Sequence, residues 1–435
     1  MSVVRSIHSQ AKPMSLPRMY RIRQSFVTPR LDDVASAVRE QLASLNLGQR
    51  VQPGQTVAIT VGSRGVANVA LITREIVQHF LSLGARPFVV PAMGSHGGAT
   101  ATGQRAVIEG FGVTEEFIGC PIKSSMETVI IDKTPQGIPV HFDKHASEAD
   151  HVFIANRIKP HTMFVGPIES GLHKMMLIGL GKQAGAVLYH RAIKSFTFGE
   201  IIRAVADVVV DRCRVVGGLG IVENAFEETC LVEGVPVDKF YERECVLLEQ
   251  ARQWMPRLPL NDIDLLVVDE IGKEISGTGM DTNVVGRKFN DHAATPDDTT
   301  NCRRIFIRGL TETTHGNGTG IGLAEFTNRR TVEALNMEST KVNCITAGHA
   351  TAAMIPVYYD TDWEVVNTAL KTLGLTEPPD ARVVQIRNTL LLQEMLVSEA
   401  CLPQLRDNPR VTIESGPFDW EFDSQANLID VPAGH

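Results

Sequence analysis

Short apolar runs alternate with amphipathic helical segments over the first half of the chain, and this alternation restricts the possible folds more than any other feature. In the segment 31–45 the apolar residues Val34, Val38 and Leu42 recur at helical spacing. The run 56–61 is mostly apolar, as expected of a strand buried on both faces. Strands are predicted at 56–61, 87–90, 151–155 and 215–222, and helices at 31–45, 69–83, 104–111 and 198–210. Strands joined by helices predict a parallel α/β sheet with both faces covered.

The length of 435 residues predicts two domains, because one hydrophobic core rarely grows to that size. Composition turns irregular near Pro256 and Pro259, so we predict an N-terminal α/β catalytic and cofactor-binding domain at 1–258 and a C-terminal α/β domain at 259–435. Both should have mostly parallel sheets, with the active site in the interdomain cleft. We leave open whether the final stretch of about 30 residues packs back on the first domain.

Local patterns complete the expected elements. Residues 1–30 should be irregular, and 128–142 should form a hairpin around the turn Thr134-Pro135-Gln136-Gly137. In the second domain we predict strands at 263–268, 304–307 and 341–345, and helices at 325–335 and 363–373.

Charge and hydropathy exclude several classes of protein. The formal net charge is -8 and no basic stripe is visible, so a nucleic-acid partner is not expected. No apolar run approaches the roughly 18 residues that a membrane span requires, and the N-terminus lacks a signal-peptide core. The seven cysteines show no metal-binding spacing and should be reduced. These features predict a cytoplasmic protein without a membrane partner.

Ligands of open α/β sheets bind beyond the carboxyl ends of strands, so the loops after the predicted strands are the first candidates for a site. The loop Gly62-Ser63-Arg64-Gly65 joins a strand to a helix. Its backbone, the helix N-terminus and the Arg64 guanidinium could together hold an anion. The alternative is a tight connection with a solvated arginine.

The loop after the next strand carries one histidine among small residues, Gly94-Ser95-His96-Gly97-Gly98. A histidine with so little cover can reach a ligand and exchange a proton near pH 7. The alternative is an ordinary surface histidine.

Titratable side chains cluster after the strand 151–155. They occur in Lys159-Pro160-His161, in Glu169-Ser170-Gly171-Leu172-His173-Lys174 and in Tyr189-His190. These residue types serve proton transfer, covalent attachment and metal binding. The pattern indicates a metal or a carbonyl-activating lysine without deciding between them, and Lys182 competes with Lys174 for the lysine role.

Together these motifs resemble the lactate racemase family. Ser63-Arg64 is similar to the family's Thr-Arg loop, Gly94-Ser95-His96 to its Gly-Thr-His loop and Pro160-His161 to its Pro-His motif. Ser170-Gly171-Leu172-His173-Lys174 resembles the segment that ends in the lysine bonded to the family's cofactor. His190 falls where the family places a nickel ligand.

The resemblance implies a nickel-pincer nucleotide, which is nickel pyridinium-3,5-bisthiocarboxylic acid mononucleotide. Lys174 would bond to it covalently, His190 would bind the metal, and Ser63, Arg64 and Gly65 would contact the cofactor. His96 and His161 would be the acid/base pair of a racemase or epimerase that acts on a 2-hydroxy acid by hydride transfer. The implied partners are a small hydroxy acid and the cofactor-synthesis proteins, and self-association into a homo-oligomer is left open.

Some positions depart from the family pattern. Val61 replaces an aspartate, and the spacing from His161 to the lysine segment is longer, so that loop must bulge. Gly279-Met280-Asp281-Thr282-Asn283 resembles the family's Pro-Leu-Asp-Gln-Asn stretch, after which Arg287 or Lys288 would bind the substrate carboxylate, a role that Arg64 could share. We interpret these differences as a substrate other than lactate, such as a larger hydroxy or sugar acid.

Two alternatives stay open. The run Gly318-Thr319-Gly320 resembles the start of a dinucleotide fingerprint, which would suit a nicotinamide-dependent hydroxy acid dehydrogenase. It does not directly follow a strand, so we predict a flexible loop at 315–322 that faces the interdomain cleft. The other alternative is a non-catalytic family member that lacks the cofactor.

Overall fold

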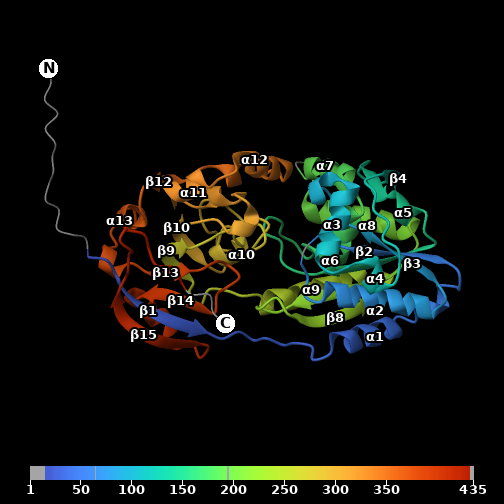
Figure 1. The fold of residues 1–435 in the computed structure, drawn as a ribbon, viewed down its shortest axis with the longest axis horizontal. Helices are drawn as coiled ribbons and strands as arrows, with labels where there is room; N and C mark the ends of the chain where they lie inside the picture. Colours follow the sequence, from blue (N-terminus) through green and yellow to red (C-terminus); the bar gives the residue numbers. More distant parts are fainter. Residues whose placement is uncertain (1–14, 64, 194, 432–435) are drawn as a thin grey trace, which may run out of the picture. The chain divides into compact units, whose positions relative to one another are not determined.

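The structure is a computed structural model that describes residues 15–63, 65–193 and 195–431. It contains two compact units, one made of Val27–Met255 and the other of Met1–Phe26 with Pro256–His435 (Figure 1). Each has its own sheet. Among the described helices, none combines the length and the apolar character that a membrane crossing needs.

The unit 27–255 is built on a five-stranded sheet in the order β3-β2-β6-β7-β8. All neighbouring strands are parallel except β8, which is antiparallel to β7. The strands are β2 (Thr56–Val61), β3 (Arg86–Pro91), β6 (His151–Arg157), β7 (Val215–Glu223) and β8 (Thr229–Val235). The four parallel strands lie where the sequence predicted them, whereas β8 was not predicted.

The longer helices of this unit are α1 (Val34–Ser44), α2 (Val69–Ser82), α3 (Ala101–Gly110), α7 (Lys182–Ala192), α8 (Phe198–Arg212) and α9 (Phe240–Trp254). The shorter ones are α4 (Glu115–Ile118), α5 (Lys144–Ser147) and α6 (Gly171–Lys174), and a π-helical turn, η3, spans Met175–Gly179. The predicted hairpin is present as β4 (Thr128–Lys133) and β5 (Pro139–Asp143).

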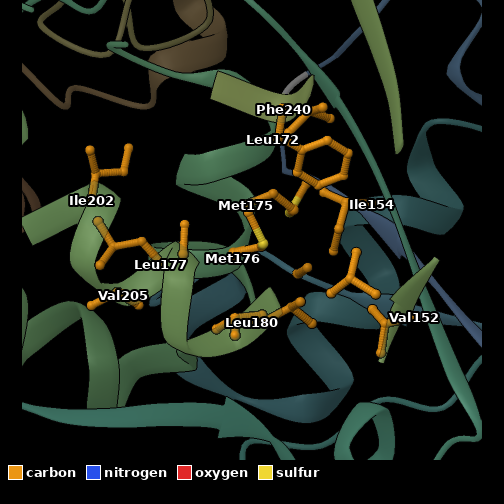
Figure 2. Close-up of a cluster of buried hydrophobic side chains, with 14 of the residues drawn as sticks. Val152, Ile154, Leu172, Met175, Met176, Leu177, Leu180, Ile202, Val205 and Phe240 are labelled. Atoms are coloured by element: carbon orange, nitrogen blue, oxygen red, sulfur yellow. The ribbon is translucent and has the colours of Figure 1, made fainter. Parts of the chain in front are cut away.

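Two separate apolar clusters show that both faces of this sheet are covered. Val57 and Ile59 of β2 pack in one cluster with residues of α1 and α2, whereas Ala58 between them belongs to the other. Figure 2 shows that second cluster, in which Val152 and Ile154 of β6 lie near side chains of α6, η3, α8 and α9. Successive strand residues point to opposite faces, so this division confirms the predicted doubly covered α/β sheet.

The strand order also locates a crevice. From β2 the chain moves to one side to form β3 and then returns past β2 to form β6. Crossovers that depart in opposite directions from two neighbouring strands leave a gap beyond their carboxyl ends, where α/β proteins bind ligands. In this sheet the gap lies after β2 and β6.

The other unit contains an eight-stranded sheet in the order β12-β11-β10-β9-β13-β14-β1-β15. The five strands from β12 to β13 are parallel, and β14, β1 and β15 continue the sheet antiparallel. The strands are β1 (Arg18–Gln24), β9 (Asp262–Val268), β10 (Asn301–Ile307), β11 (Phe326–Asn328), β12 (Val357–Tyr359), β13 (Val383–Ile386), β14 (Glu394–Ser398) and β15 (Val411–Asp419). Its helices are α10 (Thr282–Val285), α11 (Arg329–Glu333), α12 (Met337–Thr346), α13 (Asp362–Lys371) and α14 (Leu402–Leu405).

The start of the chain differs from expectation. Residues 18–24, predicted to be irregular and placed in the first domain, form β1 between β14 and β15. Near the other end, β15 pairs with β1, and the backbone N–H of Val431 donates to Asp269 of the same unit (2.7 Å). The unit that follows residue 255 therefore also includes the start of the chain.

Two elements of this unit were also predicted wrongly. The segment 341–345 is helical, because Asn336 caps α12 by accepting a hydrogen bond from the Ser339 N–H (3.1 Å). Its apolar residues Val342 and Ile345, which suggested a strand, are 64% and 67% exposed. The segment 325–335 begins with the buried strand β11, so only the short α11 is helical.

The glycine-rich segment 315–322 is a packed turn and not a flexible loop. Residues 318–323 are buried, and a Cβ on Gly320 would lie 1.7 Å from the Thr278 carbonyl oxygen. A Cβ on Gly318 would lie 2.2 Å from Leu335. The glycines thus permit close packing of this segment against the surrounding chain.

Candidate active site

The predicted site residues of the unit 27–255 follow three neighbouring strands. Ser63 follows β2, His96 follows β3 and His161 follows β6. Because β3, β2 and β6 are parallel neighbours, their carboxyl ends lie along one edge of the sheet. These loops therefore lie along that edge, where α/β proteins bind ligands.

The loops after β2 and β3 are joined through His96. The Ser63 hydroxyl is hydrogen bonded to His96 Nδ1, and the His96 side chain is exposed. Gly94 donates its N–H to the Gly179 carbonyl (3.4 Å), which connects this loop to the π-helical turn. The structure thus gives Ser63 a contact with the catalytic candidate that the sequence did not suggest.

The proposed anion site at the start of α2 is only partly described. Arg64 lies outside the described residues, and Gly65 is exposed. The Ala67 N–H donates to the Glu223 carboxylate (2.7 Å), which is also ion-paired with Arg157. A side chain of the protein already uses this N–H group, so it does not serve a bound anion.

His161 is held by its own loop. Its Nδ1 atom accepts hydrogen bonds from the backbone N–H groups of Met163 (3.0 Å) and Phe164 (3.3 Å). A ring nitrogen that accepts hydrogen bonds carries no proton, so neutral His161 has its proton on Nε2. The ring also stacks on Phe164, with centroids 4.4 Å apart.

A buried carboxylate closes the loop between His161 and the lysine segment, and the bulge predicted there stays a prediction. Glu169 accepts hydrogen bonds from the backbone N–H groups of His161 (2.8 Å) and Gly166 (3.3 Å). Arg252 of α9 forms an ion pair with Glu169 (2.8 Å) and donates to the Gly166 carbonyl (3.1 Å). Glu169 is fully buried, so this pair ties the loop to the interior.

Aromatic rings connect His161 to His190. Phe164 stacks on Phe198 with centroids 4.1 Å apart and lies 6.5 Å from the His190 ring. His190 is half-buried near the end of α7. Burial lowers the pKa of His190, and the nearby positive charge of Lys174 lowers it further. The structure therefore brings His161, His190 and Lys174 into one region.

Lys174 ends α6 and is followed directly by the π-helical turn Met175–Gly179. Turns of this kind occur often at functional sites. The preceding residue, His173, is buried, and its Nδ1 atom contacts the Glu244 carboxylate of α9 (2.6 Å). The Glu244 carboxylate also accepts the backbone N–H of His173 (3.2 Å), which fixes the helix that presents Lys174.

Lys182, the competing lysine, is fully buried. Its ammonium forms an ion pair with Asp143 (3.0 Å) and donates to the Pro91 carbonyl and to Gln104 Oε1 (3.2 Å). An ammonium has three donors, and all three have partners inside the protein. Of the two lysines, only half-buried Lys174 is placed to bond with a ligand.

In the other unit, Asp281 caps α10 by accepting the Asn283 N–H (3.0 Å). Arg287 is 1% exposed and is paired with Glu325 (3.2 Å), so its guanidinium is not accessible to a carboxylate. This enclosure argues against the predicted role of Arg287 in substrate binding, which stays a prediction. Lys288 is half-buried and stays a prediction.

Buried polar residues that support the loops were missed by the sequence analysis. Among the described residues no three His, Cys, Asp or Glu side chains gather as a metal site. The candidate site thus offers one amine, imidazole groups and a hydroxyl at the edge of an α/β sheet. This donor set suits covalent attachment and proton transfer, with at most a share of a metal's ligands.

Comparison with known proteins gives the family of this unit. Residues 10–197 match the family model described as the lactate racemase N-terminal domain. This match to residues 10–197 confirms the resemblance to the lactate racemase family that the motifs predicted.

Other comparisons are more distant. The structure of the lactate racemase apoprotein from Thermoanaerobacterium thermosaccharolyticum is similar, with 13% sequence identity and a TM-score of 0.47. The match covers 94% of this chain and 95% of that chain. The comparison with curated proteins finds no match.

Proposed function

We propose that the protein is a racemase or epimerase of a 2-hydroxy acid other than lactate, and that it uses a nickel-pincer nucleotide. The observation that carries the proposal is the placement of Lys174 beside His190 at the carboxyl edge of a lactate racemase N-terminal domain. Lys182, the other lysine of the segment, is buried among its own partners.

The residues fit such a cofactor. Lys174 would hold it through a covalent bond, and His190 would bind the metal. Burial lowers the pKa of His190, which favours a neutral imidazole that can act as a ligand, and in the cofactor-free chain the charge of Lys174 adds to this effect. When bound, the group supplies an acceptor and donor of hydride.

The two catalytic histidines would have different starting roles. His161 keeps its proton on Nε2, because its Nδ1 accepts the N–H groups of Met163 and Phe164. It can therefore donate a hydrogen bond or a proton to a substrate oxygen. His96 Nδ1 contacts a hydroxyl, which either donates or accepts, so His96 Nε2 can be the base that removes a substrate hydroxyl proton.

The changed positions favour a substrate other than lactate. Val61, which replaces the family's aspartate, is buried in the apolar core and offers no polar contact. Arg287 is enclosed with Glu325, which leaves Lys288 and Arg64 as candidates for the substrate carboxylate. A site with different polar groups should select a different acid.

The test is to produce the chain together with cofactor-synthesis proteins and to measure intact mass, nickel content and racemisation of a panel of deuterium-labelled hydroxy and sugar acids. We expect the added cofactor mass, bound nickel and inversion of at least one acid. The proposal is wrong if the loaded protein inverts none of them, or if it oxidises them only when free nicotinamide cofactor is added.

The lysine assignment has its own test. Lys174→Ala should abolish the added mass, because the competing Lys182 is enclosed by its own partners. Lys182→Ala should retain it in the folded fraction, although the protein loses stability when Asp143 is left without its ion-pair partner. The exposed Lys144→Ala is the matched control. The reverse result for residues 174 and 182 would contradict the assignment.

A further inference from the structure

A buried polar cluster lies beneath the His96 loop and has no part in the proposed chemistry. Its members are Asp143, Lys182 and Gln104, all fully buried. They come from β5, α7 and α3, which are far apart in sequence. Replacing a buried ion pair by apolar residues is often neutral or stabilising, so stability alone does not explain this cluster.

Gln104 connects the cluster to the loop. Its Oε1 atom accepts from the Lys182 ammonium (3.2 Å). Because an ammonium only donates, this contact orients the carboxamide and leaves its NH2 group toward the loop. Nε2 then donates to the carbonyl groups of Gly94 (2.8 Å) and His96 (3.3 Å).

Lys182 holds the start of the same loop. It donates to the carbonyl of Pro91, the last residue of β3, so the loop that begins there is held at Pro91, Gly94 and His96. Helix α3 is packed tightly against it, since a Cβ on Gly97 would lie 2.6 Å from the Gln104 nitrogen. Lys182 is also the first residue of α7, which carries His190.

We propose that Lys182 and Gln104 are positioning residues that hold the His96 loop in register with the helix that carries His190. The effect of these two residues on catalysis rests on the proposed function. The ion pair with Asp143 keeps the Lys182 ammonium in place. Gln104, which is oriented by that ammonium, donates two hydrogen bonds to the loop backbone. Neither residue touches the reacting atoms.

The test uses Gln104→Glu and Gln104→Met. Glutamate keeps the size of the side chain and an acceptor for Lys182, but its ionised form cannot donate to the two loop carbonyls. The matched control is Gln385→Met, because Gln385 is a fully buried glutamine of the other unit with hydrogen bonds to Asp269, Ile429 and Trp420.

The first measurement is the nitrogen NMR spectrum of the cofactor-free chain with labelled histidine, in which His96→Gln and His161→Gln assign the two rings. Both Gln104 variants should shift or broaden the His96 signals and leave those of His161 in place. Gln385→Met should lower the thermal midpoint without moving His96. Unchanged His96 signals in both folded Gln104 variants would overturn the proposal, as would an equal shift in the control.

The second measurement uses loaded protein and a substrate found in the panel. Gln104→Glu should lower kcat by about tenfold or more with KM and nickel content unchanged, since small misplacements of a catalytic group are costly. An unchanged kcat would contradict the inference. If the wild-type protein inverts no acid, the proposed function fails, while the His96 spectrum still decides whether the cluster positions the loop.

Discussion

The loops that carry His96 and His161 are held in opposite ways. In the His96 loop the backbone is held by Gln104, and the exposed ring contacts the side-chain hydroxyl of Ser63. In the His161 loop the ring itself is fixed, by two backbone N–H groups and by the stacked ring of Phe164.

This difference separates two ways of preparing a histidine for proton transfer. The backbone donors of the His161 loop select one tautomer, because Nδ1 must stay unprotonated to accept them. The Ser63 hydroxyl can reverse its role, so His96 can change tautomer without losing its hydrogen bond. We infer that His96 is the adaptable partner of the pair and His161 the fixed one.

The strongest test of the pairing removes each ring in turn. His96→Ala and His161→Ala should each reduce inversion by about a hundredfold or more, as expected for proton-transfer residues. Both variants should retain nickel and the covalent cofactor bond, which metal analysis and intact mass will measure. Loss of nickel in both would show that these histidines are ligands, and the contrast between their loops would lose its catalytic meaning.

A second test breaks the support of the His161 loop. Glu169→Gln removes the buried partner of Arg252, and breaking a buried pair costs about 3–5 kcal/mol of unfolding free energy. Because Arg252 is 30% exposed and partly solvated, we expect the lower part of that range, measured by urea unfolding. Glu249→Gln is the control, since Glu249 pairs with the same arginine (3.3 Å) but is exposed. Equal effects of the two variants would show that Glu169 does not anchor the loop.

The smallest effect is expected at Ser63. Ser63→Ala removes the hydroxyl that contacts His96 Nδ1 but leaves the loop backbone in place, so inversion should fall by about tenfold, less than the roughly hundredfold or greater effect of removing a proton-transfer residue itself. Ser63→Thr keeps a hydroxyl and should restore most of the rate. Progress curves for both enantiomers will measure the change. A rate for Ser63→Ala equal to that of the wild-type protein would remove the proposed role of this hydroxyl.

The sequence predicted the edge of the site well because strand ends are local features. The runs that form β2, β3 and β6 are apolar and short, so the loops with Ser63, His96 and His161 could be assigned to strand ends, whereas the strand order that makes them neighbours comes from the structure. The family motifs then indicated which side chains in these loops to consider.

The supporting residues could not be predicted in the same way. Lys182 and Lys174 look alike in sequence, and only the approach of Asp143 and Gln104 shows that Lys182 is enclosed. Burial of Arg287 likewise depends on Glu325, which lies 38 positions away. Contacts between distant residues decide these cases, and a single sequence carries no local signal for them.

The missed elements have local causes. Strand β1 has irregular pairing between Met19 and Ile22, which disturbs the alternation by which a strand is recognised. In α12 the apolar residues Val342 and Ile345 face outward, so the hydrophobic pattern indicated the wrong element. In both places the surroundings of the segment overrode its own pattern.

The position of β1 has a consequence for synthesis of the chain. Met19 pairs with Ser398 and Phe418, so β1 cannot pair with both neighbouring strands until the ribosome has added almost 400 more residues. The unit 27–255 is continuous in sequence and has all of its own strands by residue 235. It can therefore finish folding while the protein is still being made, whereas the eight-stranded sheet must close last.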